Sequence, residues 1–166
     1  MKIRQANAAD FEALRAIYNY EVENGCNNFD THAIDAEEWT HHMGEYNHPG
    51  DNHPLLVAVD DDNTACGYAS LSPFRAKHGY AGTVELSIYV SPNKRGHGLG
   101  NLLMEAILDA ARGSKTTHAV ISVITEDNKA SAAMHSKFGF TYQGSLHDVA
   151  YKLGEYRDIS YYQLLV

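Results

Sequence analysis

Three glycines alternate in the segment from Arg95 to Gly100, between an apolar run typical of a strand and an amphipathic stretch typical of a helix. Glycine lets the backbone turn tightly and approach a ligand closely. The first N–H groups of a helix have no partner inside it, and together with the helix dipole they attract anions. The pattern therefore predicts a diphosphate site, to which Arg95, with Lys94 as a second candidate, adds positive charge.

Three other interpretations of the glycines compete with this one. A dinucleotide-binding turn has the spacing G-x-G-x-x-G, which places its third glycine one residue after Gly100. A P-loop needs Gly-Lys followed by Ser or Thr, and the chain has no such segment. Glycines that only turn the chain from strand to helix remain as the structural alternative. Their alternation beside Arg95, after Tyr-Val-x-Pro, favours ligand binding instead.

Periodicity predicts the elements that must hold this turn. Thr83–Val90 alternates as a strand, with Glu85, Ser87 and Tyr89 on one face and the apolar residues on the other. Apolar residues at helical spacing predict a helix from Leu99 that ends at Gly113. The other expected strands lie around Ile3 and at Leu55–Val59, Cys66–Leu71, His118–Ile124, Phe140–Tyr151 and Ile159–Leu165. The other expected helices follow the cap Asn7, cover Ala36–Gly44 and follow the cap Asn128. The order βααβββαβαββ predicts an α+β or α/β sheet with helices on its faces.

The composition sets limits on the class of protein. With 166 residues, 44% of them hydrophobic, the chain is expected to form one domain over residues 1–166. The formal charge of −8, without a basic cluster, argues against nucleic acid as a partner. No apolar run approaches the ~20 residues of a membrane span, and no signal peptide is seen, so we expect a cytoplasmic protein without membrane contact. The two cysteines and ten histidines lack metal-site spacing, so no metal is expected.

Two motifs together resemble a known family. Arg95–Gly100 fits the acetyl-CoA motif Arg/Gln-x-x-Gly-x-Gly/Ala, and a second motif follows as Asn128–Ser131, His135 and Phe138–Phe140. By these segments the whole chain resembles the GCN5-related N-acetyltransferases (GNAT). It resembles still more closely their phosphinothricin and methionine sulfoximine acetyltransferase branch, through Ile17–Asn19, Gly67–Ser70, Phe74–Arg75, Thr83–Glu85 and Gln163–Leu165. The resemblance implies a mixed, mostly antiparallel sheet whose two central strands splay into a V, helices on both faces, and a homodimer.

The resemblance also implies how acetyl-CoA binds as co-substrate. Backbone groups of Ile88, Tyr89 and Val90 would contact its acetyl and pantetheine parts. The diphosphate would lie on the glycine-rich turn, formed by Arg95, Gly96, His97, Gly98, Leu99, Gly100 and Asn101. Asn128 would touch the pantetheine arm, and the spacing i, i+3, i+7 places it on one helix face with Ser131 and His135. Asn128 also fits a plain helix cap, and the two roles are compatible.

The implied reaction is direct attack of a neutral amine on the thioester, which a general base assists. Glu85 is the candidate base, because a buried carboxylate in the middle of a strand is rare unless it has a partner or a function. The alternative roles of Glu85 are a structural ion pair and binding of the substrate ammonium. His135 is the candidate acid for the leaving thiolate, and packing beside the cofactor is the alternative role.

For the substrate, Arg75 is the candidate carboxylate clamp, with a surface arginine as the alternative. Tyr80, Glu85, Leu86 and Ser87 are expected to line the same pocket. The chain departs from the branch in that pocket: Leu86 replaces a His, Gly25-Cys26 replaces Thr-Thr, and Glu155-Tyr156 replaces Arg-Trp. The expected substrate is a small-molecule amine, most simply an amino acid or analogue. The alternatives are a polyamine, a protein, or no turnover in an acyl-CoA-binding domain.

Overall fold

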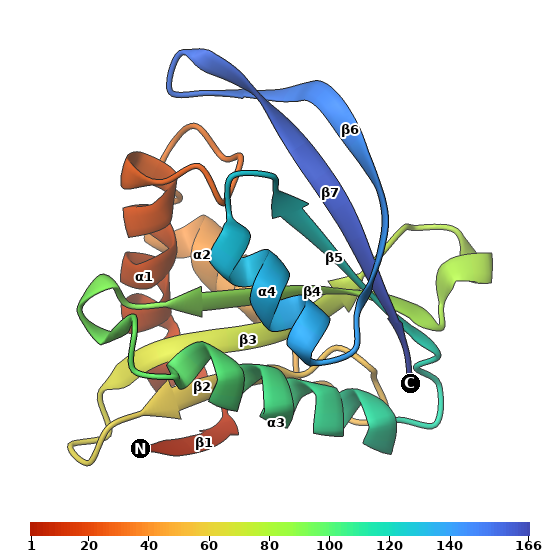
Figure 1. The fold of residues 1–166 in the computed structure, drawn as a ribbon. Helices are drawn as coiled ribbons and strands as arrows, with labels where there is room; N and C mark the ends of the chain where they lie inside the picture. The colour runs from red at the N-terminus through yellow and green to blue at the C-terminus, as the bar shows by residue number, and fades with distance from the viewer.

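The computed structural model describes residues 1–166 and contains one seven-stranded sheet in the order β1-β2-β3-β4-β5-β7-β6 (Figure 1). Its strands are β1 (Lys2–Gln5), β2 (Leu55–Val59), β3 (Ala65–Pro73), β4 (Thr83–Val90), β5 (Ala119–Thr125), β6 (Thr141–Lys152) and β7 (Glu155–Leu165). Its helices are α1 (Phe11–Asn24), α2 (Ala36–Met43), α3 (Leu99–Gly113) and α4 (Lys129–Lys137). This order of elements is the predicted one. No helix has the length and apolar character needed to cross a membrane.

The centre of the sheet opens between β4 and β5, its one parallel pair. The two strands pair only at Thr83–Ala119, Val84–Val120 and Glu85–Ile121. Beyond Glu85 they diverge, β4 staying with β3 and β5 staying with β7 (Figure 1). The expected V-shaped opening is therefore present, and Glu85 lies at its vertex.

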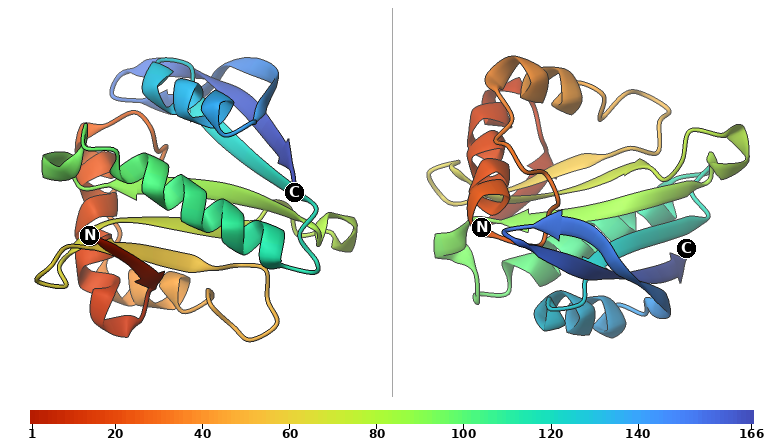
Figure 2. Two further views of the ribbon diagram at one scale, coloured as in Figure 1. Left: turned by 60° about the horizontal axis from the view of Figure 1, so that its bottom comes forward. Right: turned by 90° about the horizontal axis from the view of Figure 1, so that it is seen from above.

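Helices cover both faces of the sheet, as expected (Figure 2). On one face, α1 and α2 pack through Leu14, Trp39 and Met43 against alternate residues of β2 and against Tyr68. On the other face, α3 packs its apolar stripe against β3 and β4, and α4 adds side chains at the edge of that cluster. Each fully buried large aliphatic side chain stabilises the fold by about 1.5–3 kcal/mol. β3 and β4 are therefore packed against a hydrophobic core on each face of the sheet.

The last two strands differ from the prediction at one boundary. β7 begins at Glu155, four residues before the predicted start at Ile159. A two-residue turn at Leu153 and Gly154, both at positive φ (52° and 84°), joins it to β6 in a long hairpin. The segment before Ile159 is polar and mostly exposed, so it carries none of the apolar alternation that marks a half-buried strand.

Candidate active site

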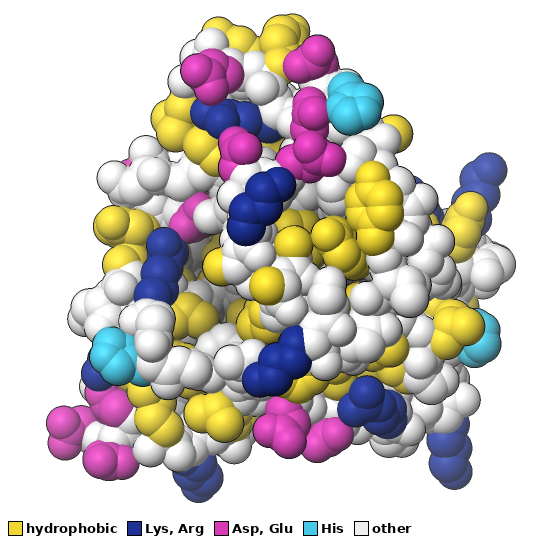
Figure 3. All heavy atoms as spheres, in the orientation of Figure 1, with side chains coloured by type: hydrophobic (Ala, Val, Ile, Leu, Met, Phe, Trp, Pro, Cys, Tyr) yellow, Lys and Arg dark blue, Asp and Glu magenta, His cyan; other side chains and the backbone are white.

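A cleft of about 660 Å³ opens where β4 and β5 separate. The molecular surface is hollowed there, with apolar side chains at the floor (Figure 3). The cleft collects most of the predicted site residues, namely Leu86, Ser87, Ile88, Tyr89, Val90, Arg95, Gly96, Gly98, Leu99, Gly100, Asn101, Asn128, Ser131 and His135. The remaining four, Arg75, Tyr80, Glu85 and His97, do not line it. Segments that lie far apart in the sequence thus line the same cleft.

The glycine-rich turn has the backbone that the sequence requires. Gly96 and Gly98 both lie in the left-handed region, at φ 79° and 80°, which favours glycine. A side chain at either would meet open space, so conformation and not crowding demands glycine there. Gly100 has a different reason, because a Cβ there would lie 3.3 Å from the Met134 sulfur of α4.

The backbone N–H groups from Gly96 to Gly100 donate to no acceptor within the protein. They surround the start of α3, where the helix dipole is positive. This donor set fits the diphosphate of acetyl-CoA. His97 lies outside the cleft, and its Nδ1 donates to the Arg95 carbonyl oxygen at 2.8 Å.

The open edge of β4 presents main-chain groups to the cleft. The Ser91 N–H donates to the Cys66 carbonyl in β3 at 2.9 Å. Because bonding direction alternates along a strand, the N–H and C=O of Tyr89 also face β3, whereas those of Ile88 and Val90 face the cleft. The predicted backbone contacts thus divide. Ile88 offers both main-chain groups and Val90 offers its N–H, since the Val90 carbonyl accepts from Arg95 Nε at 3.1 Å. Tyr89 lines the cleft with its side chain.

Glu85 is half-buried at the vertex of the V, on the sheet face opposite Val84 and Leu86, which pack into the α3 core. Burial raises the pKa of its carboxyl group, and the nearby Arg75 cation partly opposes this rise. Arg75 is exposed, with its guanidinium 4.2 Å from the centre of the Phe74 ring. Tyr80 packs edge-on against the same ring at 5.8 Å. These residues form a second group, next to Glu85 and beside the cleft.

His135 is buried in α4, and both of its ring nitrogens are engaged. Nδ1 lies 2.8 Å from the Ser131 carbonyl, which can only accept, so this nitrogen carries the hydrogen. Nε2 then accepts from the Ser122 hydroxyl at 2.9 Å. Burial lowers the pKa of the ring, which favours this neutral form. Asn128 caps α4 by accepting from the Ser131 N–H at 3.0 Å, and it also lines the cleft.

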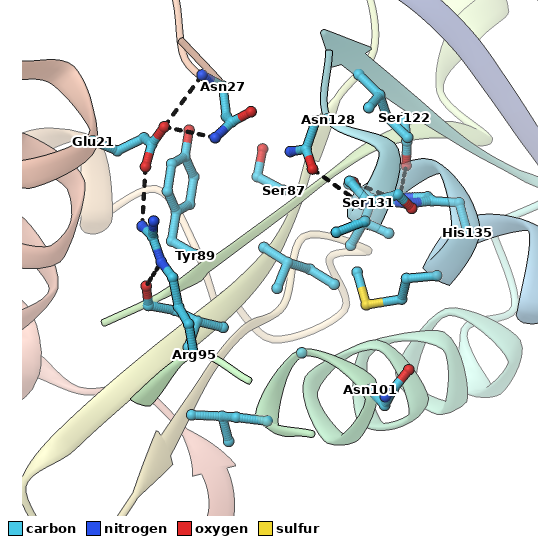
Figure 4. A pocket seen from close by; sticks show the side chains of 18 of the residues that line it. Glu21, Asn27, Ser87, Tyr89, Arg95, Asn101, Ser122, Asn128, Ser131 and His135 are labelled. Atoms are coloured by element: carbon cyan, nitrogen blue, oxygen red, sulfur yellow. Dashed lines mark hydrogen bonds and ion pairs between the residues drawn. The ribbon is translucent and has the colours of Figure 1, made fainter. Parts of the chain in front are cut away.

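Several cleft residues were not predicted from the sequence, including Glu21, Asn27 and the β5 segment Ser122–Thr125. Arg95 turns toward Glu21, placing Nη2 at 3.0 Å from Oε2 (Figure 4). One signal was present for Glu21, because it follows Leu14 and Ile17 at helical spacing on the buried face of α1. The sequence did not indicate that the β5 residues line the cleft. An apolar strand has the same pattern whether or not another strand pairs with its edge.

Comparison with known proteins agrees with this geometry. Residues 14–140 match the Acetyltransferase (GNAT) family. A phosphinothricin N-acetyltransferase of Streptomyces coelicolor is 34% identical over 98% of this chain and 95% of its own length.

Two solved structures share the fold over at least 93% of their own length. A ribosomal-protein-alanine N-acetyltransferase from Brucella melitensis is 36% identical with a TM-score of 0.91, and the match covers 100% of both chains. A putative acetyltransferase from Salmonella typhimurium, solved with its cofactor acetyl-CoA, is 31% identical with a TM-score of 0.93 over 99% of this chain and 93% of that one. The splayed sheet, the glycine-rich turn with its unpaired N–H groups and these matches agree, and the chain belongs to the GNAT family of N-acetyltransferases, which use acetyl-CoA.

Proposed function

We propose that the chain transfers acetyl from acetyl-CoA to the amine of an amino acid or analogue such as phosphinothricin or methionine sulfoximine, with Glu85 as general base. The observation that carries this proposal is the position of Glu85. Its carboxylate is half-buried at the vertex of the V, at the inner end of β4, and the glycine-rich turn lies at the outer end. A carboxylate whose pKa is raised by burial is a better proton acceptor near neutral pH than an exposed one.

When bound, acetyl-CoA supplies an activated acetyl thioester. The N–H groups of the turn would hold its diphosphate, and the free main-chain groups of Ile88 together with the Val90 N–H would align its pantetheine arm along β4. Glu85 accepts a proton from the acceptor ammonium, directly or through one water. The neutral amine would then form the new C–N bond as the C–S bond breaks, and the nitrogen would release its second proton to solvent to give the amide.

His135 and Ser122 are proposed to return a proton to the leaving thiolate. The Ser122 hydroxyl would donate to sulfur while a protonated His135 donates to Ser122, which leaves His135 neutral as the structure has it. Because the pKa of His135 is lowered by burial, the cationic form is disfavoured at neutral pH.

Replacing His135 with glutamine should lower kcat by about 10²-fold, because glutamine has no ring proton to pass to Ser122. The relay predicts that kcat of the wild-type enzyme falls as pH rises through the lowered pKa of His135, and the variant should lose this fall. Steady-state rates between pH 5 and 9 measure both effects, with Ser122→Ala as the matched variant. An unchanged kcat in both variants would leave His135 with a packing role alone.

Arg75 supports an amino acid as the acceptor. Its guanidinium lies next to Glu85 and is exposed, so it is available to pair with a substrate carboxylate. Glu155 replaces an arginine of the branch, and its negative charge was the reason to consider a polyamine. It pairs with Arg157 at 2.9 Å on the outer hairpin. The polyamine alternative thereby loses the residue on which it rested.

The Brucella relative raises a protein N-terminus as the second candidate substrate. Such a substrate needs an open groove, and here the loop after α1 and the end of the β6–β7 hairpin are tied together. Lys152, 2% exposed, donates from β6 to the Asn28 carbonyl of that loop and to the Glu21 carbonyl. This closure favours a small molecule.

Release of the CoA thiol with a panel of acceptors tests the proposal. The panel contains methionine sulfoximine, phosphinothricin, free amino acids, spermidine and a peptide with N-terminal alanine. We expect release with amino acids or their analogues, and loss of this activity when Arg75 is replaced with methionine. Release with the peptide alone would contradict the small-molecule assignment, and release with spermidine alone would contradict the role of Arg75.

We also propose a homodimer formed through the β6–β7 hairpin. Most of the large apolar side chains that are exposed in the chain belong to this hairpin, namely Tyr142, Leu146, Val149, Tyr151, Leu153, Tyr156 and Leu165. Exposed apolar side chains gathered on one element are typical of interaction surfaces. Sedimentation should give a dimer mass, and replacing Tyr151 and Leu153 with Ser should give a folded monomer. A wild-type monomer would contradict this proposal.

A further inference from the structure

Glu21 is a buried carboxylate with a full set of partners. Its side chain is 5% exposed at the end of α1. Arg95 Nη2 lies 3.0 Å from Oε2, and the Asn27 backbone N–H and side-chain amide donate to Oε1 at 3.2 and 2.8 Å. A buried charge is tolerated only when it is paired and hydrogen-bonded. Arg95 is therefore the counter-charge that allows a carboxylate in this wall of the cleft.

The same contacts hold Arg95 in one orientation at the cleft. Its Nε donates to the Val90 carbonyl at 3.1 Å while Nη2 bonds to Glu21 (Figure 4). A guanidinium has five N–H donors in a fixed plane, and Nη1 makes no bond to the protein. The Arg95 side chain is 48% exposed. Arg95 is thus fixed on one side and free to donate to an anion on the other.

We infer that Glu21 is a positioning residue, which aims Arg95 at the diphosphate of acetyl-CoA. The inference rests on the proposed placement of the diphosphate at the glycine-rich turn. A free arginine loses rotamer entropy when it is ordered by a ligand, which weakens binding. Glu21 orders Arg95 before the ligand arrives, and it belongs to α1, 74 residues away in the sequence.

The lack of a side chain at Gly25 leaves room for the carboxylate of Glu21 beside Arg95. A Cβ at position 25 would lie 1.8 Å from Glu21 Oε1, although the backbone there is extended (φ −122°) and accepts any residue. A threonine at this position, as in the related branch, would push the carboxylate away from its place. The departure Gly25-Cys26 therefore creates the space that Glu21 occupies.

Binding of CoA itself, measured by calorimetry, tests the inference without any need for turnover. Glu21→Gln keeps the size of the side chain and an oxygen for Asn27 but removes the charge that orients Arg95. We expect it to weaken CoA binding about tenfold, which corresponds to about 1.4 kcal/mol. Gly25→Ala should weaken binding in the same direction with both charges retained, and it carries the test if Glu21→Gln does not fold. Glu12→Gln is the matched control, because Glu12 pairs with Arg15 on the exposed side of the same helix.

Two further measurements separate positioning from a structural role. In an Arg95→Gln background, Glu21→Gln should have no additional effect on CoA affinity, because Glu21 acts through Arg95. With S-acetylpantetheine, which lacks the diphosphate, Glu21→Gln should leave KM unchanged. Equal or tighter CoA binding by Glu21→Gln would overturn the inference, since the carboxylate would then be idle or a competitor for Arg95. Failure of the wild-type chain to bind CoA would contradict the proposed function as well.

Discussion

Replacing Glu85 with glutamine is expected to lower kcat for amine acetylation by about 10²- to 10⁴-fold. Glutamine keeps the shape of the side chain but accepts no proton from the ammonium group. Because Glu85 does not line the cofactor cleft, the affinity for acetyl-CoA should remain that of the wild-type enzyme. Initial rates at saturating substrates and calorimetry with CoA give the two quantities. The matched control is Glu105→Gln on the exposed side of α3, which should change neither kcat nor the affinity for CoA.

The pH dependence of the wild-type enzyme provides a second test of Glu85. The base must be ionised, so kcat/KM should fall as pH drops through its pKa, which burial raises above 4.5. Glu85→Gln should lose this acidic limb. An unchanged rate at saturating amine would remove Glu85 from the role of base and leave it as a binding group.

The raised pKa of Glu85 also predicts that its replacement with glutamine increases the stability of the folded protein. A carboxyl group whose pKa is higher in the folded state than in the unfolded state begins to destabilise the fold as pH rises past the unfolded-state pKa, and the loss is complete above the folded-state pKa. At neutral pH, Glu85→Gln should therefore unfold at a slightly higher temperature than the wild-type protein. An enzyme that is less active and more stable is the signature of a carboxylate retained for catalysis.

The elements of the fold could be predicted because their signals are local. The alternation in Thr83–Val90, the glycines after it and the apolar stripe of α3 lie within one short stretch of chain. That stretch determines a strand, a tight turn and a helix whose first N–H groups remain free. The proposed position of acetyl-CoA rests on this stretch and on its family resemblance.

The partners of those residues could not be predicted, because they come from distant parts of the chain. Arg95 was expected to add charge for the ligand, and the sequence did not indicate that Glu21 of α1 holds it. His135 was the candidate acid, and the sequence did not indicate that Ser122 of β5 donates to its Nε2. Pairings of this kind depend on how the sheet halves and helices pack, and no periodicity within one segment encodes them.

Glycine at position 98 should be needed for acetyl-CoA binding beyond its contribution to stability. Alanine at φ 80° is strained by about 1–2 kcal/mol, and relief of this strain turns the N–H groups at the start of α3 away from their common direction. We expect Gly98→Ala to raise the KM for acetyl-CoA at least about tenfold, with little change in KM for the amine. Steady-state kinetics with each substrate varied in turn measures the two constants.

Gly50→Ala is the control that separates strain from binding. Gly50 has nearly the same backbone, at φ 84°, and a Cβ there also meets nothing within 4 Å, but it does not line the cofactor cleft. The two variants should lose similar stability, a few degrees in unfolding temperature, so a difference in acetyl-CoA affinity between them belongs to the site. If both variants bind acetyl-CoA as the wild-type enzyme does, the N–H groups of this turn do not hold the diphosphate. Arg95, positioned by Glu21, would then have to hold that group by itself.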